Sequence, residues 1–255
     1  RDERLGLALV LAIVDLAGAF DLDKVMRELS TFADRALDRA LNTAMNSRVP
    51  DAEPSGMIGL ALGKHGAGEL NYSSDIDPIL LYDPEKLPRR ERDEPGEAAQ
   101  RYAREVVRLL SDVTSEGYVF RVDLRLRPAS EVSPLAIPLN AAITHYESSA
   151  LAWERAAFIR ARACAGDIAA GEEFLDHIRP FVWRRSLDFG ALDEVRRPTH
   201  RIRDQHSFSS VPDPCHNLQL GRGGLRVVHF FALIHQPHPG GPNPHPTSRV
   251  TRPGP

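Results

Sequence analysis

The sequence predicts an α+β fold, in which a small mixed sheet with flanking helices is followed by a helical subdomain. Two runs rich in Ile and Leu, at 56–63 and 76–82, have the length and composition of buried strands. A third run, Tyr118–Pro128, alternates apolar and polar side chains as a half-buried strand does. From about Asn140 onward, apolar side chains recur at helical spacing.

Two helices are expected before the first strand, at 4–18 and 22–46. The apolar run of the N-terminal stretch is short and is broken by Asp15 and Asp21, which favours a buried or amphipathic helix over an export signal or a membrane span. Asp21 is also the expected N-cap of the second helix. The apolar face of the second helix is expected to contain Val25, Leu29, Phe32, Ala36 and Leu37.

The charged segment Pro84–Gly96 is expected to be a solvated loop. A helix is expected at 97–115, with Gly117 as its C-terminal stop. The prolines of Pro134–Leu139 favour a short strand at a sheet edge. Further helices are expected at 140–147, 150–164, 167–179 and about 190–204.

These patterns divide the chain into N-terminal helices at 1–47, a core at 48–139, a helical subdomain at 140–236 and a tail at 237–255. The tail holds seven of the twenty prolines and almost no apolar residues, so we expect it to be disordered. Because the chain does not begin with Met, we expect it to be a piece of a longer polypeptide.

The composition limits the classes of protein to consider. With 42% hydrophobic and 26% charged residues, the 255-residue chain resembles ordinary globular proteins. The net charge of -3 and the pI of about 6.4 disfavour a nucleic-acid-binding protein. Cys164 and Cys215 do not have the spacing of metal ligands, which favours a reduced, cytoplasmic protein. We therefore expect neither a nucleic acid nor a membrane as a partner.

Two carboxylates stand out at the start of the second predicted strand. Asp75 and Asp77 are two positions apart, so they share one face of the strand. Two such carboxylates repel each other unless a cation lies between them, and oxygen ligands of this kind suit Mg²⁺ held against a phosphate. The alternative is that both carboxylates are solvated at the strand start.

Asp123 is the third acidic candidate, because it shares the polar face of its predicted strand with Arg125 and Arg127. The aspartate could complete a metal site, and the two arginines could pair with phosphate oxygens. The alternative is a row of surface salt bridges on a half-exposed strand.

The glycine-rich turn between the first two strands could bring backbone N–H groups close to a phosphate. It contains Gly63, Gly66 and Gly68 but does not match the pattern GxGxxG, so a simple tight turn is the alternative. Lys64 and His65 beside these glycines could contact phosphate, although a single Lys in a turn is usually just solvated. Ser73 and Ser74 are expected to be cap or turn residues.

The stretch GAGELNYSSDIDPILLYD, with a third Asp further on, resembles the signature of the nucleotidyltransferase superfamily related to DNA polymerase β. The ordered set GKHGAGELNYSSDID, FRVDLRLRP, WERAAFIRARACAGD, RPFVWRRSLDF and GRGGLR resembles the glutamine-synthetase adenylyltransferase/adenylyl-removing enzyme family, from about residue 20 to 236. Its last two motifs resemble the N-terminal, adenylyl-removing half of that family.

This resemblance implies a polymerase-β-like catalytic core at 48–139. It implies phosphorolysis, in which inorganic phosphate removes AMP from adenylylated glutamine synthetase and ADP is released. The implied ligands and partners are two Mg²⁺ ions, ATP or ADP, phosphate, glutamine synthetase and a nitrogen-signalling regulatory protein. The implied site residues are Asp75, Asp77 and Asp123 for metal and catalysis, and Gly66, Gly68, Ser74, Arg125 and Arg127 for phosphate or nucleotide.

The chain departs from the family pattern at three positions. Val227 and His229 stand where the family has glutamates, and Pro78 follows the D-x-D motif where an apolar strand residue is usual. Two alternatives therefore stay open, namely adenylylation of glutamine synthetase with ATP, and a catalytically impaired domain that binds a nucleotide or a partner. An RNA-directed nucleotidyltransferase would share the D-x-D core, but the acidic charge balance disfavours it.

Overall fold

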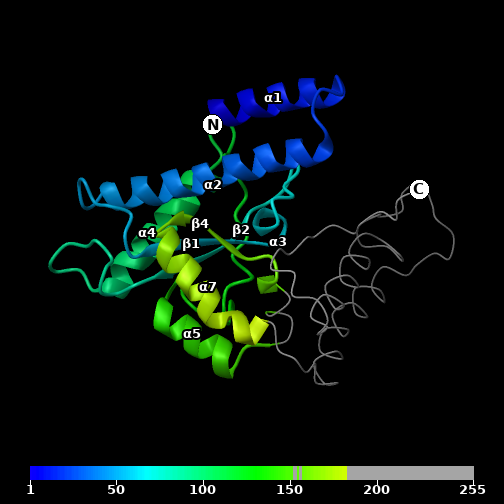
Figure 1. Cartoon of the computed structure of the whole chain (residues 1–255). Coiled ribbons are helices and arrows are strands. Elements are labelled where there is room, and N and C mark those ends of the chain that lie inside the picture. Colours follow the sequence, from blue (N-terminus) through cyan, green and yellow to red (C-terminus); the bar gives the residue numbers. More distant parts are fainter. Residues whose placement is uncertain (152–153, 155–156, 183–255) are drawn as a thin grey trace, which may run out of the picture. The chain divides into compact units, whose positions relative to one another are not determined.

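The computed structural model describes residues 1–151, 154 and 157–182. Contacts divide the chain into two compact units, the first of which contains Arg1–Ser149 and Arg160–Ile178. In this unit helices flank a small mixed sheet (Figure 1), which confirms the predicted fold class.

Four strands form the sheet within the described residues, in the order β3-β2-β1-β4. They are β1 (Met57–Leu62), β2 (Asp77–Tyr82), β3 (Ala136–Pro138) and β4 (Arg162–Gly166). The central strand β1 runs antiparallel to both β2 and β4, whereas β3 runs parallel to β2. The strands predicted at 56–63 and 76–82 and the short strand predicted at Pro134–Leu139 are thus confirmed.

The helices of the described residues are α1 (Asp2–Leu16), α2 (Leu22–Asn46), α3 (Gly63–Gly66), α4 (Pro95–Ser111), α5 (Leu139–Ser148) and α7 (Ile168–Val182). The predicted N-cap of α2 is confirmed, because Oδ1 of Asp21 accepts a hydrogen bond from the backbone N–H of Lys24 at 2.7 Å. Among the helices of the described residues, none has both the length and the apolarity that a membrane span requires.

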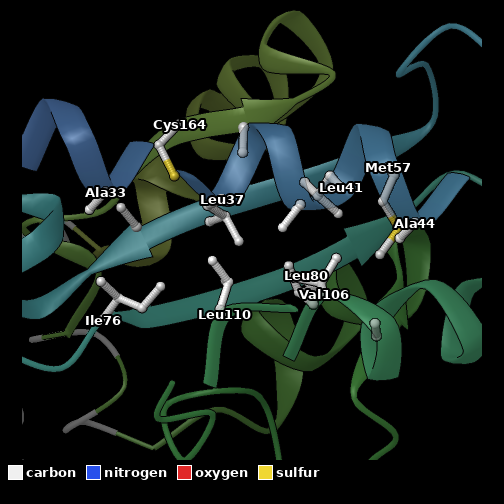
Figure 2. Packing of buried hydrophobic residues seen from close by; sticks show 14 of the residues in the cluster. Ala33, Leu37, Leu41, Ala44, Met57, Ile76, Leu80, Val106, Leu110 and Cys164 are labelled. Atoms are coloured by element: carbon white, nitrogen blue, oxygen red, sulfur yellow. The ribbon is translucent and has the colours of Figure 1, made fainter. Parts of the chain in front are cut away.

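Helices pack on both faces of β1, which explains why all six residues of this strand are buried. On one face Gly59 leaves room for α2, since a Cβ there would lie 3.3 Å from Leu37. On the other face α7 approaches so closely that a Cβ on Gly171 would lie 3.0 Å from Ile58. Figure 2 shows Leu37 and Leu41 of α2 directed toward the strands, beside Leu80 of β2.

The two N-terminal helices differ in how they are buried. In α2 the predicted apolar face is confirmed, with Val25, Leu29 and Leu37 buried and Phe32 and Ala36 packed at the edge of the core. In α1 only Leu11 is buried. Its outer face exposes five large apolar side chains: Leu5, Leu9, Val10, Ile13 and Leu16.

The strand predicted at Tyr118–Pro128 is wrong. Only Val122 pairs with the sheet, through a single parallel bridge to Ile76, and the segment then turns. Two features curl the chain after the bridge: Ala129 has a positive φ of 45°, and Arg127 donates hydrogen bonds to backbone carbonyls of the turns. The apolar side chains of the alternating pattern are each half-buried, although the segment that carries them is not a strand.

The helix predicted at 150–164 is wrong at its C-terminal end, because Arg162–Gly166 forms β4 and pairs with β1. Small residues such as Ala163 and Ala165 fit either structure, and the close packing against β1 and α7 selects the strand. The helix predicted at 97–115 ends earlier, at Ser111, and Gly117 instead closes a turn with Thr114.

Pro78 lies within β2 without disrupting it. Its neighbours Ile76 and Leu80 pair with Val122 and Ala136 on one side, and period-two alternation directs the nitrogen of Pro78 to that same side. Among the described residues Pro78 has no strand partner there, so the missing N–H removes no ladder hydrogen bond.

Several predictions concern residues outside the described ranges: the helix at about 190–204, the GRGGLR motif, Cys215, Val227, His229 and the tail at 237–255. The division of the chain at residue 139 stays a prediction, although β4 lies beyond it and joins the sheet. The helices predicted at 140–147 and 167–179 are confirmed as α5 and α7.

Candidate functional site

Asp77 is at the centre of the candidate site. It is the first residue of β2 and lies opposite Leu62, the last residue of β1. The next residue, Gly63, has a positive φ of 58°, and a Cβ on it would lie 2.6 Å from Oδ2 of Asp77. The glycine therefore has two reasons to be there: the backbone conformation and the space that the carboxylate occupies.

The single bridge between Ile76 and Val122 aligns two acidic segments. The N–H of Ile76 donates to the carbonyl of Arg121 at 3.0 Å, and the N–H of Asp123 donates to the carbonyl of Ile76 at 2.9 Å. In this parallel register Asp77 lies beside Asp123, and Asp75 lies beside Arg121. This single bridge is thus enough to bring the three aspartates near one another, and the strand predicted at Tyr118–Pro128 is not needed for it.

Two of the three aspartates are paired with arginines. Asp75 accepts from Nε of Arg121 at 2.5 Å, and the same guanidinium donates to the carbonyl of Ser73 at 2.6 Å. Asp123 accepts from Nε of Arg125, at 2.9 Å through Oδ1 and 2.8 Å through Oδ2. These arginines occupy carboxylate oxygens that a metal ion would otherwise bind, and they bring positive charge that can attract a phosphate.

Asp77 is different, because within the described residues its carboxylate accepts no hydrogen bond and forms no ion pair. Burial raises the pKa of Asp77 to about 6, and repulsion from Asp123 and Asp75 adds to the shift, against the charges of Arg125 and Lys64. The hydrogen bonds from Arg125 hold the pKa of Asp123 below its ordinary value, although burial opposes them. Among these two aspartates, only Asp77 therefore has a pKa raised above its ordinary value.

This donor set fits a divalent cation. A half-buried carboxylate to which no described residue donates, beside two further carboxylates, offers the oxygen ligands that Mg²⁺ prefers. A bound cation would also relieve the repulsion that raises the pKa of Asp77.

Gly63 and Lys64 belong to the site. The sequence placed both in or beside the glycine-rich turn, but neither was assigned a role as a site residue. Lys64 is exposed, and its charge acts on Asp77. The signal for both lay in the sequence, since they follow directly after the first apolar strand. Only the pairing of Leu62 with Asp77 shows that this point faces the carboxylates.

Arg127 and Ser74 lie near the site but make local contacts. The guanidinium of Arg127 donates to the carbonyls of Leu124 at 2.8 Å and Ser130 at 2.6 Å, so it organises the turn after Asp123. The hydroxyl of Ser74 donates to Oδ1 of Asn71 at 2.9 Å, as expected for a turn residue. Neither side chain pairs with the three aspartates.

The two predicted phosphate-site glycines have structural reasons to be glycines. A Cβ on Gly66 would lie 2.1 Å from the carbonyl oxygen of Arg160 and 2.6 Å from that of Ala61, so this residue packs directly on β1 and the start of β4. Gly68 has a positive φ of 71° and open space around it.

The chain matches the family described as glutamate-ammonia ligase adenylyltransferase over residues 2–177. It belongs to that family. It is 44% identical over 255 residues to the bifunctional glutamine synthetase adenylyltransferase/adenylyl-removing enzyme of Caulobacter vibrioides, and 42% identical over 255 residues to that of Xanthobacter autotrophicus. The corresponding protein of Rhizobium meliloti is 40% identical over 250 residues.

The alignments cover 93–96% of this chain but only 25–26% of the relatives' length. The chain therefore spans about a quarter of the curated relatives that it matches. These relatives are named for both adding and removing the adenylyl group, so their names do not assign one of the two activities to this part.

A second group of potential metal ligands lies elsewhere in this family member. Ligand atoms of Asp34, His65 and Cys164 lie within 4.8 Å of one another. Burial raises the pKa of the Cys164 thiol to about 12, and Arg162 donates to Oδ1 of Asp34 at 2.8 Å. A protonated thiol and a neighbouring guanidinium do not suit Mg²⁺, so the aspartate site fits this ion better.

A groove of about 770 Å³ lies along α1 and α2, and its lining includes Phe32, Arg35, Arg39 and Val119. None of the adenylyltransferase-family site candidates named above lines it. Its position therefore adds nothing to the assignment of the site.

Proposed function

We propose that this chain removes AMP from adenylylated glutamine synthetase by phosphorolysis. The observation that carries the proposal is Asp77, a half-buried carboxylate without a donor among the described residues, flanked by Asp75 and Asp123 and subject to the charge of Lys64. Membership of a family whose relatives are named adenylyltransferase/adenylyl-removing enzymes supports the reaction class and the protein substrate.

In this proposal Asp75, Asp77 and Asp123 hold two Mg²⁺ ions. When bound, the ions would neutralise phosphate charge and stabilise the departing tyrosinate. Asp77 would contribute an oxygen for which no donor among the described residues competes, and Arg121 and Arg125 would release the other two carboxylates.

The released arginines then act on the phosphates. Arg125 has the more exposed side chain, at 86%, and with Lys64 it would pair with oxygens of the attacking phosphate. Gly66, Gly68 and Ser74 shape the turns around the phosphate and nucleotide. We assign Arg127 a supporting role, because its guanidinium is occupied by backbone carbonyls.

The proposed step transfers the adenylyl group between two oxygens. An oxygen of inorganic phosphate attacks the phosphorus of the AMP–tyrosine linkage, and the bond from phosphorus to the tyrosine oxygen breaks. ADP leaves, and the tyrosinate takes up a proton from water. The chain's own residues position the phosphate and screen charge, so the step needs no covalent protein intermediate.

Labelled substrates test the direction of the reaction. With Mg²⁺, labelled inorganic phosphate and adenylylated glutamine synthetase, the proposal predicts labelled ADP. Transfer of label from ATP to unmodified glutamine synthetase, without formation of labelled ADP in the first assay, would instead assign adenylylation. Nucleotide binding without turnover in either assay would assign an impaired binding domain.

The proposal places the reaction in the cytoplasm, where the cysteines are expected to stay reduced. A nitrogen-signalling regulatory protein and the absence of a nucleic-acid partner remain predictions from the sequence.

A further inference from the structure

The turn after β1 forms one wall of the candidate site. Gly63 lies against the carboxylate of Asp77, and the charge of Lys64 acts on that carboxylate. The turn holds itself together with three backbone hydrogen bonds, from Ala67 to Gly63 at 3.2 Å, from Gly68 to His65 at 3.1 Å and from Glu69 to Lys64 at 2.8 Å. A single helical turn is marginal by itself, so its position depends on outside anchors.

Arg162 of β4 holds the turn by hydrogen bonds on the side away from Asp77. Its Nε donates to the carbonyl of Gly66 at 3.2 Å, and a terminal nitrogen donates to the carbonyl of His65 at 3.2 Å. Arg162 lies opposite Ala61 in the β1–β4 pairing, so the guanidinium is carried by the sheet itself. The carbonyls of the turn are thereby tied to β4.

Asp34 of α2 joins this arginine to the turn a second time. Oδ1 of Asp34 lies 2.8 Å from a terminal nitrogen of Arg162 and 2.7 Å from Nε2 of His65, whose side chain is fully buried. Burial alone would raise the pKa of Asp34, but the hydrogen bonds from His65 and Arg162 bring it below its ordinary value. The carboxylate thus stays charged between its two partners.

The turn has little space to move on this side. Gly66 contacts the carbonyls of Arg160 and Ala61 so closely that a Cβ would overlap with both. Displacing the turn would therefore shift Gly63 and Lys64 relative to Asp77, because only Gly63, Lys64 and His65 connect Gly66 to Leu62 at the end of β1.

We propose that Asp34, His65 and Arg162 are positioning residues that hold the turn so that Lys64 and Gly63 stay in register with Asp77. The proposal rests on the proposed function for its kinetic consequence but not for its structural one. Loosening this cluster is expected to weaken phosphate binding while the fold persists.

Hydrogen exchange of the full 255-residue chain tests the structural part. In Arg162→Gln the amides of Ala67, Gly68 and Glu69 should exchange about tenfold faster than in the unsubstituted chain. Arg101→Gln is the matched control, because Arg101 has the same 35% side-chain exposure as Arg162 and also contacts carboxylates, Asp93 and Glu97. Equal exchange in the two variants would overturn the proposal.

If Arg162→Gln does not fold, Asp34→Asn and Arg162→Lys carry the same comparison. Arg162→Lys keeps the charge but not the fork of donors, so it should restore protection only in part. Protection in Asp34→Asn and Arg162→Lys that equals the unsubstituted chain would also overturn the proposal.

The kinetic part uses the KM for inorganic phosphate in the phosphorolysis assay. Arg162→Gln should raise this KM about tenfold with a smaller change in kcat, whereas Arg101→Gln should leave both unchanged. A lower kcat at constant KM would contradict the positioning role. If the unsubstituted chain shows no turnover, the proposed function fails, and hydrogen exchange still decides whether the cluster holds the turn.

Discussion

At Asp77, the stability of the fold and the binding of a cation favour opposite protonation states of the carboxyl group. Its carboxylate is half-buried between two other aspartates and accepts no hydrogen bond within the described residues, so the folded chain disfavours its charged form. A divalent cation needs that same charged form. We interpret the lost stability as the consequence of keeping a carboxylate available for a ligand.

The pKa of Asp77 predicts how stability and metal binding depend on pH. Because its pKa rises from 3.8 to about 6 on folding, this group's contribution to stability is present below 3.8 and is lost as the pH rises through about 6. Affinity for Mn²⁺ or Mg²⁺ should increase over the same window. Urea unfolding and calorimetry at about pH 5 and about pH 8 measure both quantities.

Asp77→Asn is the corresponding variant. Without metal at about pH 8, it should unfold at a higher urea concentration than the unsubstituted chain, and metal should no longer raise its stability. Metal-dependent stabilisation that survives this substitution would contradict the assignment of Asp77 as a ligand.

Gly63→Ala tests the contact between the turn and Asp77. The Cβ would overlap with Oδ2 of Asp77, so we expect calorimetry to show metal affinity at least about tenfold lower. Gly68→Ala is the matched control, because Gly68 also has a positive φ, of 71° against 58° for Gly63, but has nothing within 4 Å. Similar losses in both variants would attribute the effect to backbone strain alone.

Among the elements, those with local signals were predicted correctly. Asp21 and the apolar face that follows it define α2, and the runs of Ile and Leu define β1 and β2. The elements that were missed depend on distant partners. Arg162–Gly166 becomes β4 because it pairs with β1, and the segment after Val122 turns because Arg127 binds its carbonyls.

The candidate site shows the same division. The carboxylates could be predicted because D-x-D spacing in a strand places two side chains on one face. The contact of Gly63 with Asp77 could not be predicted, since it depends on the register between β1 and β2. The occupation of Arg127 by carbonyls likewise depends on a turn that the alternating pattern conceals.

The packing of α2 on β1 should dominate the stability of the first unit. Leu37 is fully buried against Gly59, so Leu37→Ala should lower the free energy of unfolding by about 2–5 kcal/mol. Leu16→Ala is the control, because Leu16 is 90% exposed and its loss should cost less than about 0.5 kcal/mol. Chemical denaturation measures both values, and equal losses would contradict the layer arrangement.

The arginines after Asp123 should separate in function. Arg127→Gln should increase proteolytic cleavage within the turns that follow Leu124, because four backbone carbonyls lose a donor. Arg125→Gln should leave cleavage unchanged and raise the KM for phosphate. Limited proteolysis and steady-state kinetics distinguish the two, and the opposite pattern would exchange the proposed roles.

At the scale of the whole molecule, the chain contains a small mixed sheet. It belongs to a family whose curated relatives it matches over about a quarter of their length. The relatives are named for two opposing activities, and a fold by itself assigns neither of them. The proposed function differs from the adenylylation alternative in whether the adenylyl group is removed from or added to glutamine synthetase at the aspartates. Phosphorolysis consumes inorganic phosphate and releases ADP, whereas adenylylation consumes ATP, so assays with the two substrates separate the activities.

The most direct test is the rate at which ADP is released from adenylylated glutamine synthetase in the presence of Mg²⁺ and inorganic phosphate. The account predicts phosphate-dependent release by the unsubstituted chain and a rate more than about a hundredfold lower for Asp77→Asn. Release that is absent from the unsubstituted chain, or unchanged in Asp77→Asn, would contradict it.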